Sequence, residues 1–174
     1  YFHRIKQLDA VLKHSGAELA LMGVKPTFPS EKYGYIVPKR NPNLGQEYDV
    51  VSHFREKPDA VTARQLIEQH ALWNCGVFAF TLGYMESVLR SKGLSFDYEQ
   101  LLKQYHTLPK ISFDYEVVEK TERIVVLPYQ GEWKDLGTWN TLTEEIPASI
   151  VGKGIISEDS LYSHIVNELD IPVV

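Results

Sequence analysis

Four short segments of the sequence gather charged, polar or flexible residues beside apolar runs of strand type. Residues 54–58 put the carboxylate of Glu56 next to the ammonium of Lys57, where a strand is expected to stop. Residues 73–76 place an amide and a glycine just ahead of the next expected strand, and residues 133–139 set one acid and one base between two tryptophans. Brought into one crevice, such groups could pair with the charges and hydrogen-bonding groups of a polar ligand.

The fourth segment, residues 33–35, places Gly34 inside an expected strand, and such a glycine often marks the close approach of a ligand or of another backbone. Each segment also has an ordinary structural interpretation. Glu56 and Lys57 suit a solvated turn, Trp73 and Asn74 suit a packed aromatic with a turn amide, and Gly34 suits a bulge. Any one of them alone is more often structural, so it is their joint presence that indicates function.

Several other kinds of catalytic or metal site have no signal in the sequence. It contains no Cys-x-x-Cys, no His pair at metal-ligand spacing, no G-x-S-x-G, no P-loop and no G-x-G-x-x-G. The six histidines are scattered, and the single cysteine, Cys75, lies beside an apolar strand. We therefore expect Cys75 to be a buried, inert thiol rather than a nucleophile.

The elements that must position these segments alternate between helices and strands. Apolar spacing predicts helices over 1–16, 60–70, 82–92, 98–105, 113–120 and 138–146, and strands over 18–23, 33–38, 48–55, 76–80 and 123–127. Turn residues fill 41–47, and short β-like pieces follow residue 150. This order predicts an α/β fold with a largely parallel or mixed sheet, in which ligands bind outside the carboxyl ends of the strands.

The composition is that of a folded globular protein: 174 residues, 44% hydrophobic and 24% charged, with a net charge of −5. That charge argues against nucleic acid as a partner, because nucleic-acid binders carry clustered basic surfaces. No apolar run approaches the ~18 residues of a membrane helix, so we expect no membrane partner. One cysteine allows no internal disulfide, which favours a reducing cytoplasm. The chain opens in mid-pattern, as expected of a fragment.

Five motifs, in order, resemble those of the sugar-phosphate nucleotidyltransferase family. Residues 54–58 are similar to its F-x-E-K-P motif, and residues 73–78 to its W-N-x-G-hydrophobic-F motif. Three further segments resemble the mannose-1-phosphate guanylyltransferases within that family: 23–27 with 33–36, 111–120 (close to S-I-D-Y-A-V-M-E-K) and 133–139 (W-x-D-hydrophobic-G-[ST]-W). One such motif alone would be weak, whereas the ordered series across residues 20–145 is specific.

The resemblance implies a Rossmann-like nucleotidyltransferase fold with a mixed, mostly parallel sheet. Family members begin with a glycine-rich phosphate-binding loop and carry a metal-holding aspartate further on, and neither is present in this sequence. We therefore expect an N-terminally truncated fold that lacks the nucleotide-binding segment. Residues 1–147 would be the C-terminal part of the catalytic domain, and residues 148–174 the start of a β-rich, β-helix-like extension.

The implied activity is the transfer of GMP from GTP to mannose-1-phosphate, which gives GDP-mannose and pyrophosphate with Mg²⁺ as cofactor. Such chemistry needs charge neutralisation and in-line positioning more than acid–base help. The resemblance implies that Lys57 and Asp135 are catalytic residues: Lys57 would anchor the sugar phosphate, and Asp135 would hold the metal. The other interpretations are a solvent-exposed turn lysine for Lys57 and, for Asp135, an acid near a helix N-terminus.

The same resemblance assigns the sugar to Gly34, Glu56, Asn74 and Asp114. Glu56 and Asn74 would accept and donate hydrogen bonds to sugar hydroxyls, and Gly34 would let the backbone approach the sugar. Asp114 lies in a characteristic family motif, although a helix-capping role explains it equally well.

Two other functions stay open from the sequence. One is a relative with another sugar or base, such as a glucose-1-phosphate thymidylyltransferase, because the residues that select the base belong mainly to the absent N-terminal part. The other is a non-catalytic module that binds a sugar phosphate. The expected partners are thus mannose-1-phosphate and GTP, and exposed sheet edges would favour assembly into a homo-oligomer.

Overall fold

The computed structural model describes residues 2–39 and 47–174, so most of the turn expected over 41–47 lies outside the described residues. The chain divides into two compact units, residues 1–131 and residues 132–174, which are considered separately below. These two units are defined by contacts within the fold. The boundary expected from the sequence, between residues 147 and 148, separates a catalytic domain from its extension, and it stays a prediction.

The N-terminal unit is built on five strands: β1 (Leu19–Val24), β2 (Tyr35–Pro38), β3 (Asp49–Arg55), β4 (Leu72–Phe80) and β5 (Ile124–Tyr129). They form a closed sheet in the order β1-β4-β2-β3-β5. Only β1 and β5 pair in parallel, whereas the pairs β1–β4, β2–β4, β2–β3 and β3–β5 are antiparallel. The predicted α/β class with a mixed sheet is confirmed.

The expectation of a mostly parallel sheet is wrong, and connection length gives a reason. Only residues 39–48 separate β2 from β3, and a parallel crossover needs about a dozen residues or more, usually including a helix. The two strands therefore pair as an antiparallel hairpin, with Ile36 opposite Phe54. The closed, largely antiparallel arrangement differs from the open Rossmann-like sheet that the family motifs implied.

The inside of the closed sheet is the main hydrophobic core. Residues of the strands pack there against Val118, which belongs to a short 3₁₀ helix, η2 (Val118–Lys120). The buried residues of this core are Leu19, Leu21, Ile36, Val51, Phe54, Val118, Ile124 and Val126. The core therefore ties η2 to four of the five strands.

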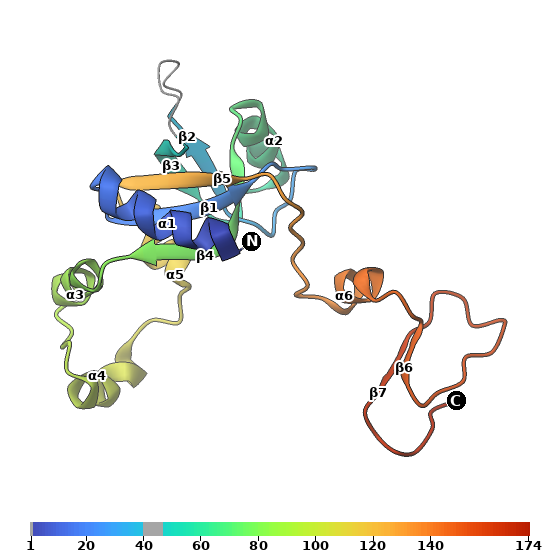
Figure 1. The fold of residues 1–174 in the computed structure, drawn as a ribbon. Coiled ribbons are helices and arrows are strands. Elements are labelled where there is room, and N and C mark those ends of the chain that lie inside the picture. The colour runs from blue at the N-terminus through green and yellow to red at the C-terminus, as the bar shows by residue number, and fades with distance from the viewer. Residues whose placement is uncertain (1, 40–46) are drawn as a thin grey trace. The chain divides into compact units, whose positions relative to one another are not determined.

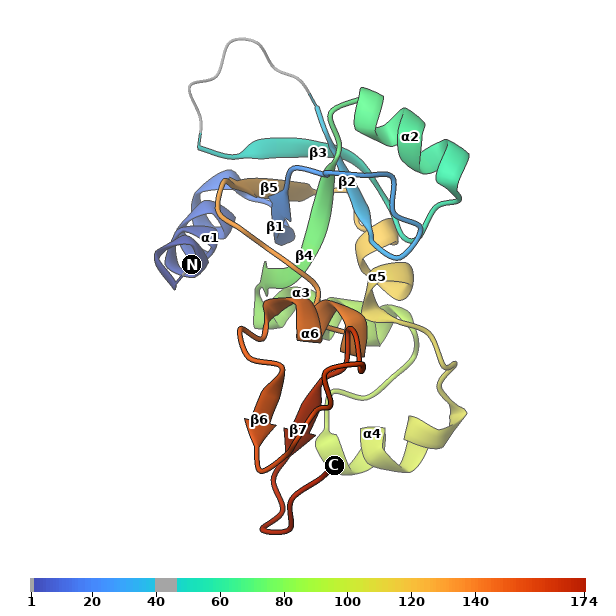
Figure 2. The same ribbon diagram turned by 90° about the vertical axis from the view of Figure 1, so that its right-hand side faces the viewer.

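Helix α1 (Phe2–Ser15) covers the outside of the same sheet, along β1 and β5 (Figures 1 and 2). Its buried residues Leu8, Val11 and Leu12 form a second core with Ala20, Val125 and Leu127. This packing explains why both faces of β1 are buried along its whole length. The predicted helix over 1–16 is confirmed, although Phe2 and Ile5, which the spacing placed on its apolar face, are exposed.

The remaining helices follow β3 and β4. Helix α2 (Ala60–Glu68) begins after Asp59, whose side chain accepts a hydrogen bond from the Thr62 N–H. Between β4 and β5 come α3 (Leu82–Ser91), α4 (Tyr98–Gln104), the 3₁₀ helix η1 (Tyr105–Thr107), α5 (Phe113–Glu116) and then η2. The single helix expected over 113–120 is therefore divided: at Val117 φ is −119°, which ends α5.

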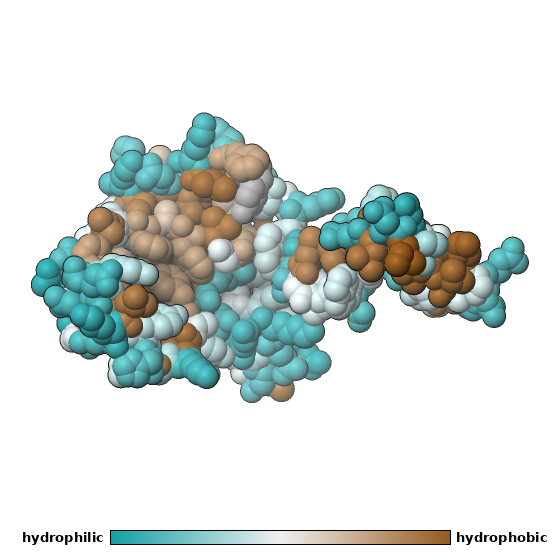
Figure 3. Space-filling view, turned by 90° about the horizontal axis from the view of Figure 1, so that it is seen from below, coloured by the Kyte–Doolittle hydropathy of each residue, from teal (hydrophilic) through white to brown (hydrophobic). Residues whose placement is uncertain are grey.

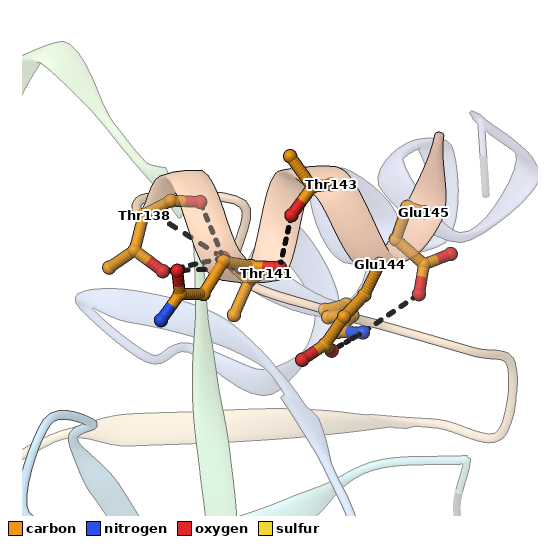
Figure 4. Close-up of polar contacts among 7 residues, drawn as sticks. Thr138, Thr141, Thr143, Glu144 and Glu145 are labelled. Carbon is orange, nitrogen blue, oxygen red and sulfur yellow. Dashed lines mark hydrogen bonds and ion pairs between the residues drawn. The ribbon is translucent and has the colours of Figure 1, made fainter. Parts of the chain in front are cut away.

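The C-terminal unit begins with α6 (Trp139–Glu145), which a reciprocal pair of threonines caps at its start. The Thr138 hydroxyl accepts the Thr141 N–H, and the Thr141 hydroxyl accepts the Thr138 N–H. Lys134 pairs with Glu144 and Glu145, so the chain ahead of the helix is fastened to its last turn (Figure 4).

Strands β6 (Ile150–Gly152) and β7 (Ile165–Asn167) pair in parallel after this helix. Asn167 is buried, and its amide donates to the carbonyls of Lys153 and Ile171. Many apolar side chains of this unit stay at its surface, among them Leu161, Leu169 and Ile171 (Figure 3).

Across the described part of the chain, no helix combines the length and the apolar content that crossing a bilayer requires.

Gly23 lies in β1 at a position where an added side chain would lower the stability of the fold. A Cβ there would lie 2.9 Å from the Leu72 Cβ and 3.1 Å from the Val126 Cγ2. Gly23→Ala should therefore destabilise the fold by about 1–3 kcal/mol through overpacking, measured by urea unfolding. Gly83→Ala is the matched control: in α3 nothing lies within 4 Å of the added Cβ, so this change should stabilise by up to ~1 kcal/mol. Equal effects of the two substitutions would contradict the packing of β1 against β4 and β5.

Candidate functional site

Gly34 lies where the ends of three strands come together. It precedes β2 directly instead of lying inside a strand, as the sequence had suggested. Its carbonyl accepts the Asn74 N–H of β4 at 2.8 Å. A Cβ on Gly34 would come within 2.5 Å of both the Glu56 Oε2 and the Phe54 Cζ. Glycine is therefore required here because the Glu56 carboxylate packs against the backbone itself.

Glu56 and Lys57 follow the last residue of β3, as predicted, but their environments differ sharply. The Glu56 side chain is only 7% exposed, whereas that of Lys57 is 51% exposed, and the Lys57 Nζ lies 3.6 Å from the Glu56 Oε1. Lys57 has a φ of 43°, in the left-handed region that residues other than glycine seldom adopt. Its N–H donates to the Tyr33 carbonyl at 3.2 Å, so the surrounding chain holds a strained residue in place.

Burial raises the pKa of the Glu56 carboxyl above its ordinary value of 4.5. The nearby Asp114 carboxylate raises this pKa further, while the Lys57 ammonium lowers it but does not offset the other two effects. A negative charge on Glu56 is therefore costly in the folded chain, as is usual for a carboxylate taken out of water.

Asn74 lies within β4, which begins at Leu72, so the expectation that it precedes the strand is wrong. The apolar run over 76–80 marked only the second half of β4. Residues 72–74 are paired as well, since Leu72 lies opposite Ile36 and Trp73 opposite Tyr35. The Asn74 Nδ2 donates to the Asp114 Oδ1 at 2.9 Å, and the Asn74 Oδ1 accepts the Gly76 N–H at 3.1 Å.

Asp114 stands in α5, a helix of four residues that packs against β4. The Phe113 ring contacts those of Phe78 and Phe80, with ring centroids 5.3 and 5.8 Å away. On the same short helix, Glu116 is paired with both Lys92 and Lys120. Ser112 caps the helix by accepting the Tyr115 N–H, so the Asp114 carboxylate makes its hydrogen bond to Asn74 instead of serving as the cap.

The structure thus brings together five of the six residues singled out in the sequence. We call Gly34, Glu56, Lys57, Asn74 and Asp114 the polar site. The site joins an ammonium, an amide and two carboxylates, and a glycine lets the backbone approach one of the carboxylates. No sequence pattern indicated the hydrogen bond between Asn74 and Asp114, because a contact across forty residues leaves no local signal.

The sixth residue, Asp135, belongs to the C-terminal unit. Its side chain is exposed, and its Oδ1 accepts the Gly137 N–H at 2.9 Å, two residues ahead of α6. Carboxylate oxygens are suitable ligands for Mg²⁺, which is often bound through one or two carboxylates together with phosphate oxygens. Within residues 2–39 and 47–174, no group of three or more His, Cys, Asp or Glu side chains could hold a metal ion. A metal ion bound by Asp135 would therefore need further ligands from outside these residues.

Cys75 follows Asn74 in β4 and is half-buried. Burial raises the pKa of its thiol to about 12, so the thiol is protonated at neutral pH. Because the thiolate is the nucleophilic form, Cys75 is unsuited to act as a nucleophile.

Replacing Glu56 should change how stability depends on pH. A carboxyl with a raised pKa binds more protons in the folded than in the unfolded chain, so stability falls as pH rises above 4.5 through the folded pKa. Glu56→Gln removes this penalty. The variant should have a higher Tm than the wild type at about pH 8, and the difference should shrink as pH falls to about 5.

Thermal unfolding across that pH range tests this expectation. Glu68→Gln is the control, because Glu68 is an exposed acid near the end of α2. If Glu56→Gln lowered the Tm equally at every pH, the carboxylate would be a stabilising partner of Lys57 and not a strained, buried charge.

Comparison with known proteins places this chain in a family. Residues 3–150 match the nucleotidyl transferase family. A mannose-1-phosphate guanylyltransferase of Sinorhizobium fredii is 29% identical over 151 residues, which are 77% of this chain and 29% of that protein. The xanthan biosynthesis protein XanB of Xanthomonas campestris is 32% identical over 144 residues, which are 73% of this chain and 30% of that protein.

A solved structure agrees with the sequence relatives. The crystal structure described as mannose-1-phosphate geranyltransferase from Thermus thermophilus has a TM-score of 0.69 and 28% identity, and the match covers 87% of this chain and 48% of that one. The chain thus spans about 30% of the length of the curated relatives named above. On the extent of the family match and the agreement in fold, the chain belongs to the nucleotidyl transferase family.

Proposed function

We propose that this chain is the sugar-phosphate part of a mannose-1-phosphate guanylyltransferase, which transfers GMP from GTP to mannose-1-phosphate. The observation that carries the proposal is the polar site itself. A half-exposed ammonium on strained backbone stands beside a buried carboxylate, and an amide and a second carboxylate lie within hydrogen-bonding range of one another. A sugar phosphate needs the same combination: a cation for its phosphate and several polar groups for its hydroxyls.

Lys57 is the residue to which we assign the phosphate. A phosphate oxygen of the sugar attacks the α-phosphorus of GTP, a new P–O bond forms, and the bond to pyrophosphate breaks. The phosphate dianion is already a nucleophile, so the step needs no general base. It needs a positive charge that reduces the repulsion between two anions as they approach. Lys57 can supply this charge because half of its side chain is open to solvent.

Glu56, Asp114 and Gly34 are assigned to the sugar ring. A buried acceptor left without its hydrogen bond by the wrong epimer costs about 1–3 kcal/mol, which is enough to select between sugars. Glu56 is well suited to this selection because it is 7% exposed and so has little water to replace a lost partner. Gly34 keeps side-chain atoms away from the same carboxylate.

Asp135 is the residue that we propose to hold Mg²⁺, since its exposed carboxylate offers the oxygen ligands that this ion prefers. When bound, the ion would supply further charge neutralisation on the phosphates. Its partner ligands would be phosphate oxygens and groups beyond the described residues. The expected cytoplasmic setting and the expected homo-oligomer stay predictions.

Sugar-phosphate binding by the chain is the direct test of this function. Titration calorimetry with mannose-1-phosphate should show binding, with weaker binding of glucose-1-phosphate and of mannose without its phosphate. Lys57→Ala should weaken the affinity for mannose-1-phosphate about 10- to 100-fold, because a charge-assisted hydrogen bond contributes roughly 1.5–3 kcal/mol. Lys103→Ala, which removes an exposed lysine of α4, should leave the affinity unchanged.

The alternatives give different results in the same experiment. A preference for glucose-1-phosphate would favour a thymidylyltransferase-like relative. Selective binding without nucleotidyl transfer, when the chain is tested as part of its parent protein, would favour a binding module. If no sugar phosphate bound, or if Lys57→Ala and Lys103→Ala behaved alike, the assignment of this site would be wrong.

A further inference from the structure

Both ends of the Asn74 side-chain amide make hydrogen bonds to other parts of the chain. Its Oδ1 accepts the Gly76 N–H at 3.1 Å, and its Nδ2 donates to the Asp114 Oδ1 at 2.9 Å. The backbone N–H of the same residue donates to the Gly34 carbonyl at 2.8 Å. Asn74 is therefore fixed by three hydrogen bonds to three segments, and its side-chain oxygen faces the Gly76 N–H.

A bulge in β4 produces this arrangement. Gly23 of β1 lies opposite Asn74 and Leu21 lies opposite Phe78, so the register shifts between the two pairs and residues 75–77 of β4 face Met22 alone. Gly76 has a φ of 69°, in the left-handed region. The Gly76 N–H donates to the Asn74 Oδ1, a local hydrogen bond of the kind that asparagine commonly makes two residues ahead.

A side chain at position 76 would be disfavoured by the backbone conformation of Gly76 and not by a lack of space. Nothing lies within 4 Å of a Cβ built on Gly76. A side chain would fit, but the left-handed backbone that it would have to adopt is unfavourable. Bulges commonly redirect a side chain next to a functional site, and the side chain that this bulge fixes is Asn74.

Asp114 is the group on which Asn74 acts. The amide holds one carboxylate oxygen, Oδ1, and so sets the rotation of the whole group. Asp114 is also close enough to Glu56 to affect its ionisation. The orientation of the Asp114 carboxylate therefore decides the direction in which its acceptor oxygens face, on the side of the polar site where Glu56 lies.

We propose that Asn74 is a positioning residue: held by Gly76 across the β4 bulge, its amide orients the Asp114 carboxylate to accept a hydrogen bond from a sugar hydroxyl. This inference rests on the proposed function. The sequence led to the expectation that Asn74 contacts the sugar directly. The present proposal assigns that contact to Asp114, so that Asn74 affects sugar binding only through Asp114.

A double-mutant cycle separates action through Asp114 from direct contact. Asn74→Ser is the suitable substitution, because a serine hydroxyl can still accept the Gly76 N–H but is too short to bridge to Asp114. Asn74→Ser and Asp114→Ala should each weaken mannose-1-phosphate binding by about tenfold, and the double variant should be no weaker than Asp114→Ala within about twofold. Additive losses, near a hundredfold in the double variant, would mean that Asn74 contacts the ligand independently and would overturn the proposal.

Binding of inorganic phosphate distinguishes positioning from a general loss of structure. Lys57 is unchanged in all these variants, so their affinity for phosphate should equal that of the wild type. An equal loss of phosphate and sugar-phosphate affinity in Asn74→Ser would show that the substitution disturbs the whole site, and would contradict the specific role.

A second substitution covers the case in which Asn74→Ser does not fold. Asn74→Asp keeps the oxygen that accepts the Gly76 N–H, but it replaces the donor that faces Asp114 with a negatively charged acceptor. It should weaken mannose-1-phosphate binding at least tenfold at about pH 8, and the loss should disappear in the Asp114→Ala background. A loss that persisted there would overturn the proposal.

The wild-type titration separates the two proposals. If the wild-type chain did not bind mannose-1-phosphate, the proposed function and this inference would both fall. If it bound with Lys57 dependence but the cycle were additive, only the positioning role of Asn74 would be wrong.

Discussion

The packing of the Glu56 carboxylate against the backbone of Gly34 is the contact on which the rest of the site depends. It demands a glycine, because a Cβ would come within 2.5 Å of the carboxylate oxygen. It places a carboxyl in a setting that disfavours its charge, and it brings the Lys57 ammonium beside that charge. The closed sheet makes the contact because β2 pairs with both β3 and β4, so that the residues at these strand ends must meet.

The polar groups at this contact carry an electrostatic cost. The Glu56 carboxylate is held out of water and is influenced by the Asp114 carboxylate, and both effects disfavour its charge. A further cost falls on Lys57, whose left-handed backbone costs of order 1–3 kcal/mol. The hydrophobic core around Phe54 and Val118 lies directly beside these residues. Its packing can offset such local costs and keep the polar groups from relaxing into solvent.

The sequence predicted the parts of the fold that local patterns control. Helical spacing located α1 and α3 almost to the residue, and Ser112 lies next to the start of the helix that was expected to follow it. The helix expected from residue 138 begins one residue later, at Trp139. Local patterns could not predict which strands pair or in which direction. Pairing depends on the length of each connection and on the other strands that complete the closed sheet. The start of β4 was missed for a related reason: Trp73 and Asn74 look like turn residues until Tyr35 and Gly34 are placed opposite them.

Several residues in and beside the polar site depart from local structural rules. Gly34 stands beside a strand where a side chain would be expected, and Glu56 is a charged residue that becomes buried. Lys57 takes a backbone conformation suited to glycine, and the bulge at Gly76 interrupts the pairing of β4. Natural sequences tend to break such rules at functional sites. Four departures within one small region therefore argue for a binding site on physical grounds that are independent of any family resemblance.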